Sequence, residues 1–218
     1  MSSASQRLFA LRLCLPVLLA SCATYNPHLT PTITPAHTTD IAVTADALIV
    51  DRGVGPQVLP APDVSLRRGV GDAWDIGVRL FPLGAELSAR ARLYRSPTYE
   101  LSLLPLFATG LVSATNADTS FVGVGAGLIA LNGFHLGKHS VLTVGLRSGI
   151  EVGLNAVAVE EDFSAARWRL LIGGSIALDQ MVSERWALSP GVVVLVPYDL
   201  DRTELAFPII QGGLSAHW

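Results

Sequence analysis

The sequence has little charge, few cysteines and no long apolar run beyond its first 21 residues. Charged residues make up 15% of the 218-residue chain, against about 25% in ordinary soluble domains. Half of the residues are apolar, and the mean hydropathy is +0.46. The net charge of −3 gives no reason to expect nucleic acid as a partner. Because no later stretch has about 18 uninterrupted apolar residues, helical membrane spans are excluded, and a closed β-barrel is the remaining way to embed this chain.

Residues 1–21 have the order of a signal peptide. Arg7 supplies the positive charge, and the apolar stretch that follows is interrupted by Arg12 and broken by Pro16. It ends in Leu19-Ala20-Ser21-Cys22, which resembles the lipobox of bacterial lipoproteins. The resemblance implies cleavage before Cys22, a diacylglyceride on its sulfur and palmitate-type acylation. The alternatives are an ordinary signal peptide beside a coincidental cysteine, and an uncleaved helix, which at about a dozen apolar residues is short of the ~20 that span a bilayer.

The two cysteines fit the same interpretation. Cys14 leaves with the signal and Cys22 is occupied by lipid, so the mature domain has no thiol for a disulfide, a metal or redox chemistry. Ala23 and Thr24 follow the lipobox, with no Asp after the cysteine. Resemblance to enterobacterial lipoproteins then implies transfer to the outer membrane. The implied partners are membrane lipid, the lipoprotein export machinery and the outer-membrane assembly machinery.

Residues 22–40 are rich in Thr and Pro, with Pro27, Pro31 and Pro35 at four-residue steps. Such a segment cannot build a core of its own, and its composition predicts a disordered, extended linker between lipid and domain. His28 and His37 lie in it and are expected to be solvated. A metal site there needs further ligands, which the neighbouring sequence does not offer.

Residues 41–218 are predicted to form one domain, because apolar and polar positions alternate with period two in segments separated by turn residues. The fold class is all-β, an antiparallel up-and-down barrel of 8–10 strands; eight remain if the first two segments are not strands. The expected strands are 42–51, 62–69, 74–82, 84–95, 98–110, 120–133, 139–154, 167–179, 185–197 and 205–218.

Alternation alone leaves two barrels open. A soluble barrel has its apolar face inside and a membrane barrel has it outside. Many segments are 11 to 16 residues long, while 9 to 11 suffice to cross a bilayer, and short connections alternate with longer ones, except at the tight turn 81–84. The terminal Trp218 resembles the C-terminal signature of Gram-negative outer-membrane barrels, and residues 71–80 resemble a hairpin of small barrels of this kind. These features favour the membrane form.

The polar face of a membrane barrel would place ten charged residues in the lumen. They are Asp75, Arg79, Glu86, Arg90, Arg92, Glu100, Arg147, Glu151, Arg167 and Arg169. A barrel of this size is just wide enough to be filled by side chains, so mutual pairing is the first expectation. The functional alternative is a narrow pore that favours anions, since six of the ten are arginines.

Catalysis and metal binding find little support in the sequence. Ser215 and His217 share a face of the last strand, as in a lipid hydrolase, but no third catalytic group can be placed. His135 and His139 flank a turn without further ligands, so neither metal nor cofactor is expected. The sequence therefore predicts a lipid-anchored outer-membrane barrel of structural or narrow-pore type. The alternative is a lipid-tethered periplasmic barrel that binds an apolar ligand, and a third hypothesis is a lipid-modifying enzyme.

Overall fold

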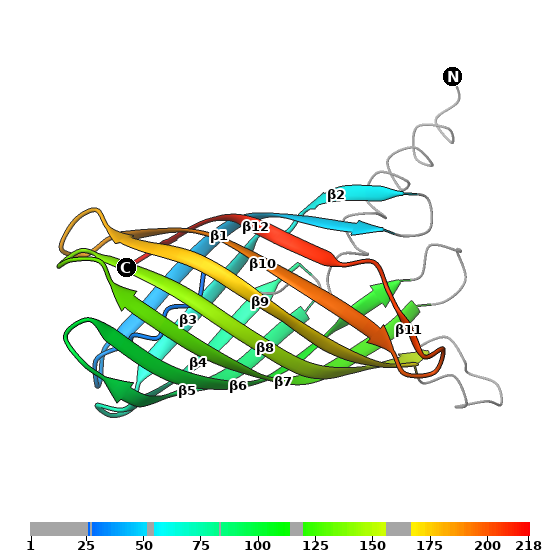
Figure 1. Cartoon of the computed structure of the whole chain (residues 1–218), viewed down its shortest axis with the longest axis horizontal. Helices are drawn as coiled ribbons and strands as arrows, with labels where there is room; N and C mark the ends of the chain where they lie inside the picture. Colours follow the sequence, from blue (N-terminus) through cyan, green and yellow to red (C-terminus); the bar gives the residue numbers. More distant parts are fainter. Residues whose placement is uncertain (1–25, 27, 52–54, 83, 114–119, 156–166) are drawn as a thin grey trace, which may run out of the picture.

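The structure is a computed structural model and describes residues 26, 28–51, 55–82, 84–113, 120–155 and 167–218. These residues form strands joined by turns (Figure 1). The strands are β1 (Thr39–Asp51), β2 (Pro56–Pro60), β3 (Asp63–Gly69), β4 (Trp74–Phe81), β5 (Gly84–Arg95), β6 (Tyr99–Ser113), β7 (Ser120–His135), β8 (Ser140–Asn155), β9 (Arg167–Met181), β10 (Ala187–Asp199), β11 (Glu204–Leu205) and β12 (Ile209–His217). Within the described ranges, the structure contains no helix long and apolar enough to cross a membrane.

Ten of these strands close into an antiparallel barrel. The ring runs β1-β3-β4-β5-β6-β7-β8-β9-β10-β12 and returns to β1, because β12 pairs with both β10 and β1. The backbone N–H groups of Ile41 and Trp218 donate to each other's carbonyl oxygens at 2.9 and 3.0 Å, which completes the seam. The predicted all-β barrel is confirmed, with ten strands rather than eight.

Two short strands lie outside the ring, and neither was expected from the sequence. β2 pairs with β1 beyond β3, and β11 pairs with the end of β10. Pro56 and Pro60 bound β2, and proline weakens the strand signal although it is tolerated on an edge strand. The last strand also begins at Ile209 rather than at 205, because residues 206–208 include Pro208, which has no N–H to donate to a ladder.

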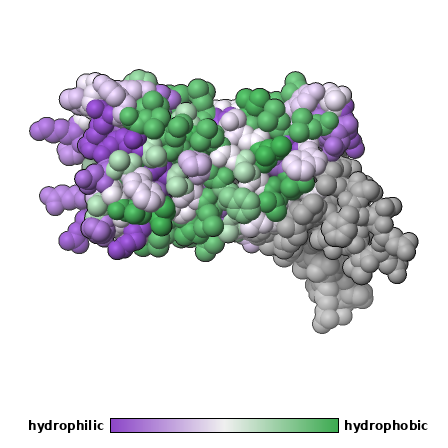
Figure 2. Space-filling model, turned by 90° about the horizontal axis from the view of Figure 1, so that it is seen from below, coloured by the Kyte–Doolittle hydropathy of each residue, from purple (hydrophilic) through white to green (hydrophobic). Residues whose placement is uncertain are grey.

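The side chains alternate across the barrel wall. In β4, Trp74, Ile76 and Leu80 are exposed on the outside, while Asp75 and Arg79 are buried inside. The same alternation holds along the other strands, so exposed large apolar residues cover the outer wall and polar or charged residues line much of the interior. Figure 2 shows the apolar residues over the middle of the barrel, with hydrophilic residues concentrated toward its ends. The apolar face therefore points outward.

The two ends of the barrel differ. The connections 70–73, 96–98, 136–139 and 182–186 meet at one end together with the C-terminus, and we call this the turn end. The opposite end, which we call the loop end, is where β1, β4, β6 and β8 end and where β5, β7 and β9 begin, and it holds the connection 200–208. The short connections thus gather at one end, as the sequence predicted, and the tight β4–β5 connection is the exception on the loop end.

Candidate functional site in the barrel lumen

The N-terminal segment before β1 lies inside the barrel. Residues 28–36, which we call the plug, include the buried side chains of Leu29, Pro31, Ile33 and Thr34, and the blue trace in Figure 1 runs within the ring of strands. The expectation of a solvated, disordered linker is therefore wrong for this segment. The physical reason is that proline-rich chain is extended and does not need a ladder of its own, so its carbonyl groups remain free to accept bonds from the lumen.

A tight reversal joins the plug to the first strand. His37 has a left-handed φ of 65°, its N–H donates to the Gly69 carbonyl at 3.0 Å, and Thr38 donates to the Pro35 carbonyl from both its N–H and its hydroxyl. A Cβ atom at Gly69 would collide with the carbonyl oxygen of Pro35. Glycine at this position therefore lets the plug lie directly against the end of β3.

The main charged cluster of the lumen is built around Asp75, whose side chain is fully buried. Its two oxygens each lie 2.5 Å from a guanidinium nitrogen, one of Arg67 and one of Arg90. The backbone N–H of Thr34 also donates to Asp75 at 2.9 Å. The attraction between the carboxylate and the two guanidinium groups offsets the desolvation penalty of burying three charges. The bond from Thr34 also anchors the plug to this cluster.

A second set of bonds holds the middle of the plug. Arg90 donates to the Thr30 carbonyl, Ser102 Oγ donates to the Pro31 carbonyl at 2.7 Å, and Thr32 Oγ1 donates to Glu100 Oε2 at 3.3 Å. Glu100 also faces Arg92 at 3.6 Å and His135 at 3.8 Å. The barrel wall therefore binds both backbone carbonyls and a side chain of the plug.

The plug also makes apolar and polar contacts closer to the loop end. Leu29 packs in a buried cluster that is completed by Leu104, Ile129 and Leu131. His28 Nε2 lies 2.8 Å from Asp46 Oδ1, and Gln211 donates to the other oxygen of Asp46 at 2.7 Å. His28 is thus buried against Asp46 of β1, which corrects the expectation that it is solvated.

A third charged cluster lies beside the tight β4–β5 connection. Arg79 donates to Asp63 at 3.3 Å and to Glu86 at 2.8 Å, and its guanidinium carbon stands 5.2 Å from the centre of the Phe81 ring. All of these side chains are buried. The cation–π contact and the two carboxylates together compensate for the burial of this arginine.

The ten lumen charges expected from the sequence are placed unevenly. Asp75, Arg79, Glu86, Arg90, Glu100 and Arg147 are buried, while Arg92 and Glu151 are partly exposed. Arg169 is exposed near the loop-end start of β9, and the side chain of Arg167 lies outside the described residues.

Sequence reasoning missed Asp46, Asp63 and Arg67. They belong to the first two barrel strands, the least secure of the predicted segments. The alternation of Thr44, Asp46 and Leu48 was the signal that could have found the first of them.

The described residues enclose a small cavity in the lumen. A cavity of about 50 Å³ lies on the loop-end side of Leu29 and is lined by Phe81, Glu86, Leu106, Ile129 and Arg147 among others. One buried water needs roughly 10–15 Å³, so this cavity has room for a few waters.

The proposed catalytic pair is not formed. Ser215 Oγ lies 3.3 Å from Thr44 Oγ1, whereas His217 contacts Asp179 at 2.9 Å, Ser189 at 3.3 Å and Asp40 at 3.4 Å. Ser189 is only 1% exposed, and a carboxylate competes with it for Nε2 of His217. An accessible nucleophile with a free histidine base is therefore not present in this cluster.

His135 faces Glu100, and His139 is exposed in its turn. No group of His, Cys, Asp and Glu among the described residues is arranged to hold a metal ion.

Comparisons with known proteins give no family. No family model matches the chain, and no curated protein matches it. Among solved structures, it is similar to the attachment invasion locus protein Ail of Yersinia pestis, at a TM-score of 0.37 and 11% identity over 84% of this chain and 99% of that one. It is similar to Neisserial surface protein A at 0.39 and 12%, over 82% and 94%. For the translocator domain of the autotransporter NalP from Neisseria meningitidis the values are 0.40 and 12%, over 99% and 97%. Because these TM-scores are below 0.5, the similarities to these structures carry no argument about function.

Proposed function

We propose that this protein is a lipid-anchored outer-membrane β-barrel of a Gram-negative bacterium whose lumen is closed by its own N-terminal plug, with a structural role and no enzymatic chemistry. The observation that carries the proposal is the direction of the two faces. Leu87 and Leu146 are about 60% exposed on the outer wall, whereas Asp75 and Glu100 are fully buried inside. Transfer of a large apolar side chain out of water is favourable by about 1.5–3 kcal/mol, and contact with lipid provides this free energy for the outer wall.

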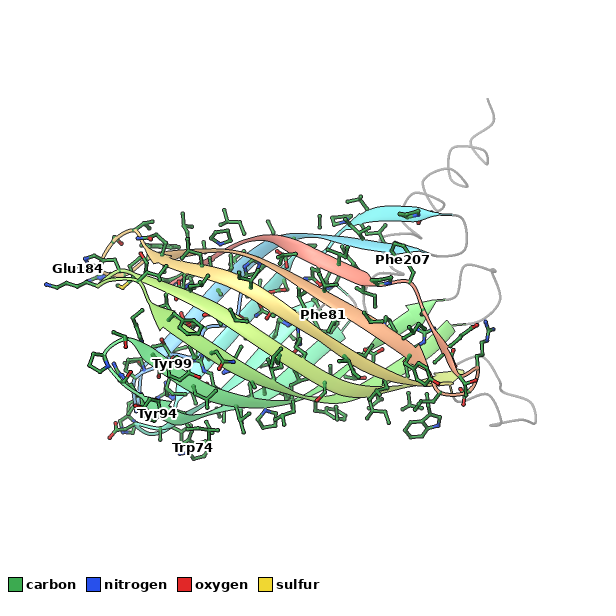
Figure 3. All side chains as sticks on the ribbon, viewed as in Figure 1. Trp74, Phe81, Tyr94, Tyr99, Glu184 and Phe207 are labelled. Atoms are coloured by element: carbon green, nitrogen blue, oxygen red, sulfur yellow. The ribbon has the colours of Figure 1, made fainter. Side chains whose placement is uncertain are left out.

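Aromatic side chains support the membrane placement. At the turn end, Tyr99 lies between Tyr94 and Phe134 with the rings tilted against one another and ring centres 6.0 and 5.4 Å apart, and Trp186 packs against Trp218 at 4.6 Å. Figure 3 shows Trp74, Tyr94 and Tyr99 at this end and Glu184 in the turn beyond them. An aromatic girdle at the boundary of an apolar band is typical of transmembrane barrels, because these rings prefer the membrane–water interface.

The plug favours a closed barrel over the narrow pore that the arginines suggested. The guanidinium groups of Arg67, Arg79 and Arg90 are each bonded to carboxylates, so they are not available to attract a passing anion. The plug fills the turn-end half of the lumen. The soluble alternative requires a cavity lined by Leu, Val and Trp, whereas these residue types dominate the outer wall.

Two measurements test this function. With residues 1–22 replaced by a non-lipid export signal, the domain should resist alkaline carbonate extraction from the outer-membrane fraction. In planar bilayers, the full-length protein should show no steady conductance, and a variant lacking residues 28–36 should conduct. Release of the domain into the periplasm would contradict the membrane barrel, and steady conductance of the intact protein would contradict the plug.

Cys22 and the signal peptide lie outside the described residues, so lipidation rests on the motif Leu19-Ala20-Ser21-Cys22. Intact mass of the purified protein tests it. The expected mature chain starts at Cys22 and carries a diacylglyceride and a further acyl chain, and a Cys22→Ser variant should lose both. An unmodified wild-type N-terminus would contradict the anchor without affecting the barrel.

A further inference from the structure

The path of the plug fixes the side of the membrane on which the N-terminus emerges. We propose that the plug threads the N-terminus up through the barrel, so that the lipid on Cys22 is anchored in the outer leaflet, at the loop end, instead of the periplasmic leaflet. This inference rests on the lipidation and the orientation proposed above.

The contacts of the plug give its direction. Ala36 forms a bridge with Gly69 at the turn end of β3, and Thr34 bonds Asp75, the second residue of β4. Pro31 accepts a bond from Ser102, the fourth residue of β6, and His28 meets Asp46, the eighth residue of β1. Strands β1, β4 and β6 start at the turn end, and β3 ends there. Followed backwards from β1, the chain therefore climbs from the turn end toward the middle of the barrel.

A return to the turn end through the lumen is blocked. Asp75, Glu100 and Ser102 are fully buried at the level of the plug, and a Cβ atom at Gly133 would collide with the ring of Pro31. At this level the plug and the side chains packed against it occupy the interior that the ten-stranded wall encloses. A second pass of main chain beside the plug does not fit.

The segment before the plug is also too short to bring Cys22 back to the periplasmic leaflet. Five residues lie between Cys22 and His28, and the six steps between these two residues, at about 3.4 Å each, reach roughly 20 Å when fully extended. Asp46 is seven residues from the turn end of β1, a height of about 18 Å for a strand tilted by about 40°. A path back to the periplasmic leaflet needs this descent plus a passage outward around the rim, which exceeds the reach.

At the loop end, the barrel wall is shortest at the β4–β5 connection, and we place the exit of the N-terminus there. β4 has 8 residues and ends at Phe81, whereas β1 has 13. Leu80 pairs with Val64, so Phe81, the next residue of β4, lies beside Asp63 of β3. Asp63 in turn pairs with Thr44 of β1, two residues before Asp46. The wall at the β4–β5 connection therefore ends near the level of His28. At about 18 Å from the turn end, this level lies in the outer half of an apolar band about 25 Å tall.

Cysteine labelling in whole cells tests the inference, because an acylated Cys22 leaves the mature chain without a free thiol. We expect Thr24→Cys to react with a large, membrane-impermeant PEG-maleimide in intact cells, to the same extent as Asp201→Cys at the loop end. Lys138→Cys at the turn end should react only after the outer membrane is permeabilised. Protection of T24C in intact cells, while D201C reacts, overturns the inference whatever happens after permeabilisation.

The controls separate this inference from the function on which it rests. Labelling of the wild-type protein would show a free Cys22 thiol and contradict lipidation, and protection of D201C in intact cells would contradict the orientation. T24C placed in a variant lacking residues 28–36 gives a matched comparison, since the shortened N-terminus then begins at the turn end. In that background T24C should change to the behaviour of K138C while D201C still reacts from outside. If T24C stays surface-labelled without the plug, the plug does not set the side, and the inference is wrong.

Discussion

The substitution Asp75→Asn removes the negative charge that holds two buried arginines and one end of the plug. The side chain keeps its size, so the effect is electrostatic: the guanidinium groups of Arg67 and Arg90, each 2.5 Å from a carboxylate oxygen, lose their shared counter-ion. Breaking a buried ion pair by neutralising one partner costs about 3–5 kcal/mol. With a urea dependence near 3 kcal/mol per molar, the upper end of the usual range, the unfolding midpoint should fall by about 1–2 M.

Tryptophan fluorescence during reversible urea unfolding in lipid vesicles measures this shift. Asp72→Asn is the matched control, because Asp72 is exposed in the β3–β4 turn three residues away and should change stability by no more than about 0.5 kcal/mol. Replacing all three charges at once, as R67M/D75L/R90M, should recover part of the loss, since apolar groups of similar size no longer leave an unpaired charge. A D75N midpoint equal to that of D72N would refute the claim that this cluster stabilises the barrel.

Three further substitutions test other parts of the account. Leu146→Arg, in the middle of β8, should destabilise the barrel in vesicles by about 2–4 kcal/mol, whereas L136R in a turn should cost about 0–1 kcal/mol, although both leucines are 63% exposed; equal costs would contradict the membrane placement. Trp218→Ala removes the contact with Trp186 and should lower thermal stability by about 0.5–1.5 kcal/mol, as measured by loss of the heat-modifiable folded band; a W218A band that melts with wild type would contradict a role for this pair. His217→Gln leaves Asp40 and Asp179 facing each other at the seam and should lower the same melting temperature, unlike H139Q, which alters an exposed turn residue.

Much of the barrel could be predicted from the sequence because period-two alternation directly reports the wall. In β4, the order of Trp74, Asp75, Ile76 and Arg79 specifies both the strand and the face that each residue occupies. Alternation does not say which face is inside, and segment length, connection length and the terminal Trp218 were needed for that. These features favoured the outward apolar face that the structure shows.

The plug could not be predicted, because its signal is compositional. Pro31 and Pro35 indicate an extended chain, and extended chain is equally compatible with solvent and with a lumen. An extended chain lies in the lumen only if the wall offers partners for its N–H and carbonyl groups. Here these partners include Asp75 of β4 and Ser102 of β6, which are far from the plug in the sequence. A ten-stranded ring also leaves more interior than its own side chains fill, and the plug occupies part of that space.

The partners of individual lumen charges were beyond sequence reasoning for a related reason. Arg67 and Asp75 lie on neighbouring strands, but their contact depends on the register that pairs Arg67 with Gly77. Gly77 matters here because its missing side chain leaves space that the guanidinium of Arg67 occupies. Periodicity predicts which residues face the lumen, and register decides which of them meet.

Spin-label scanning of residues 142–150 in β8 tests the central claim most directly, namely that the apolar wall of this barrel faces lipid. Even-numbered positions such as 146 and 150 point outward, and odd-numbered positions such as 143 and 147 are buried. In vesicles, labels at even positions should be accessible to oxygen dissolved in the bilayer and protected from a water-soluble nickel reagent, and labels at odd positions should be protected from both. High nickel accessibility at the even positions would show that this wall faces water and would contradict the account.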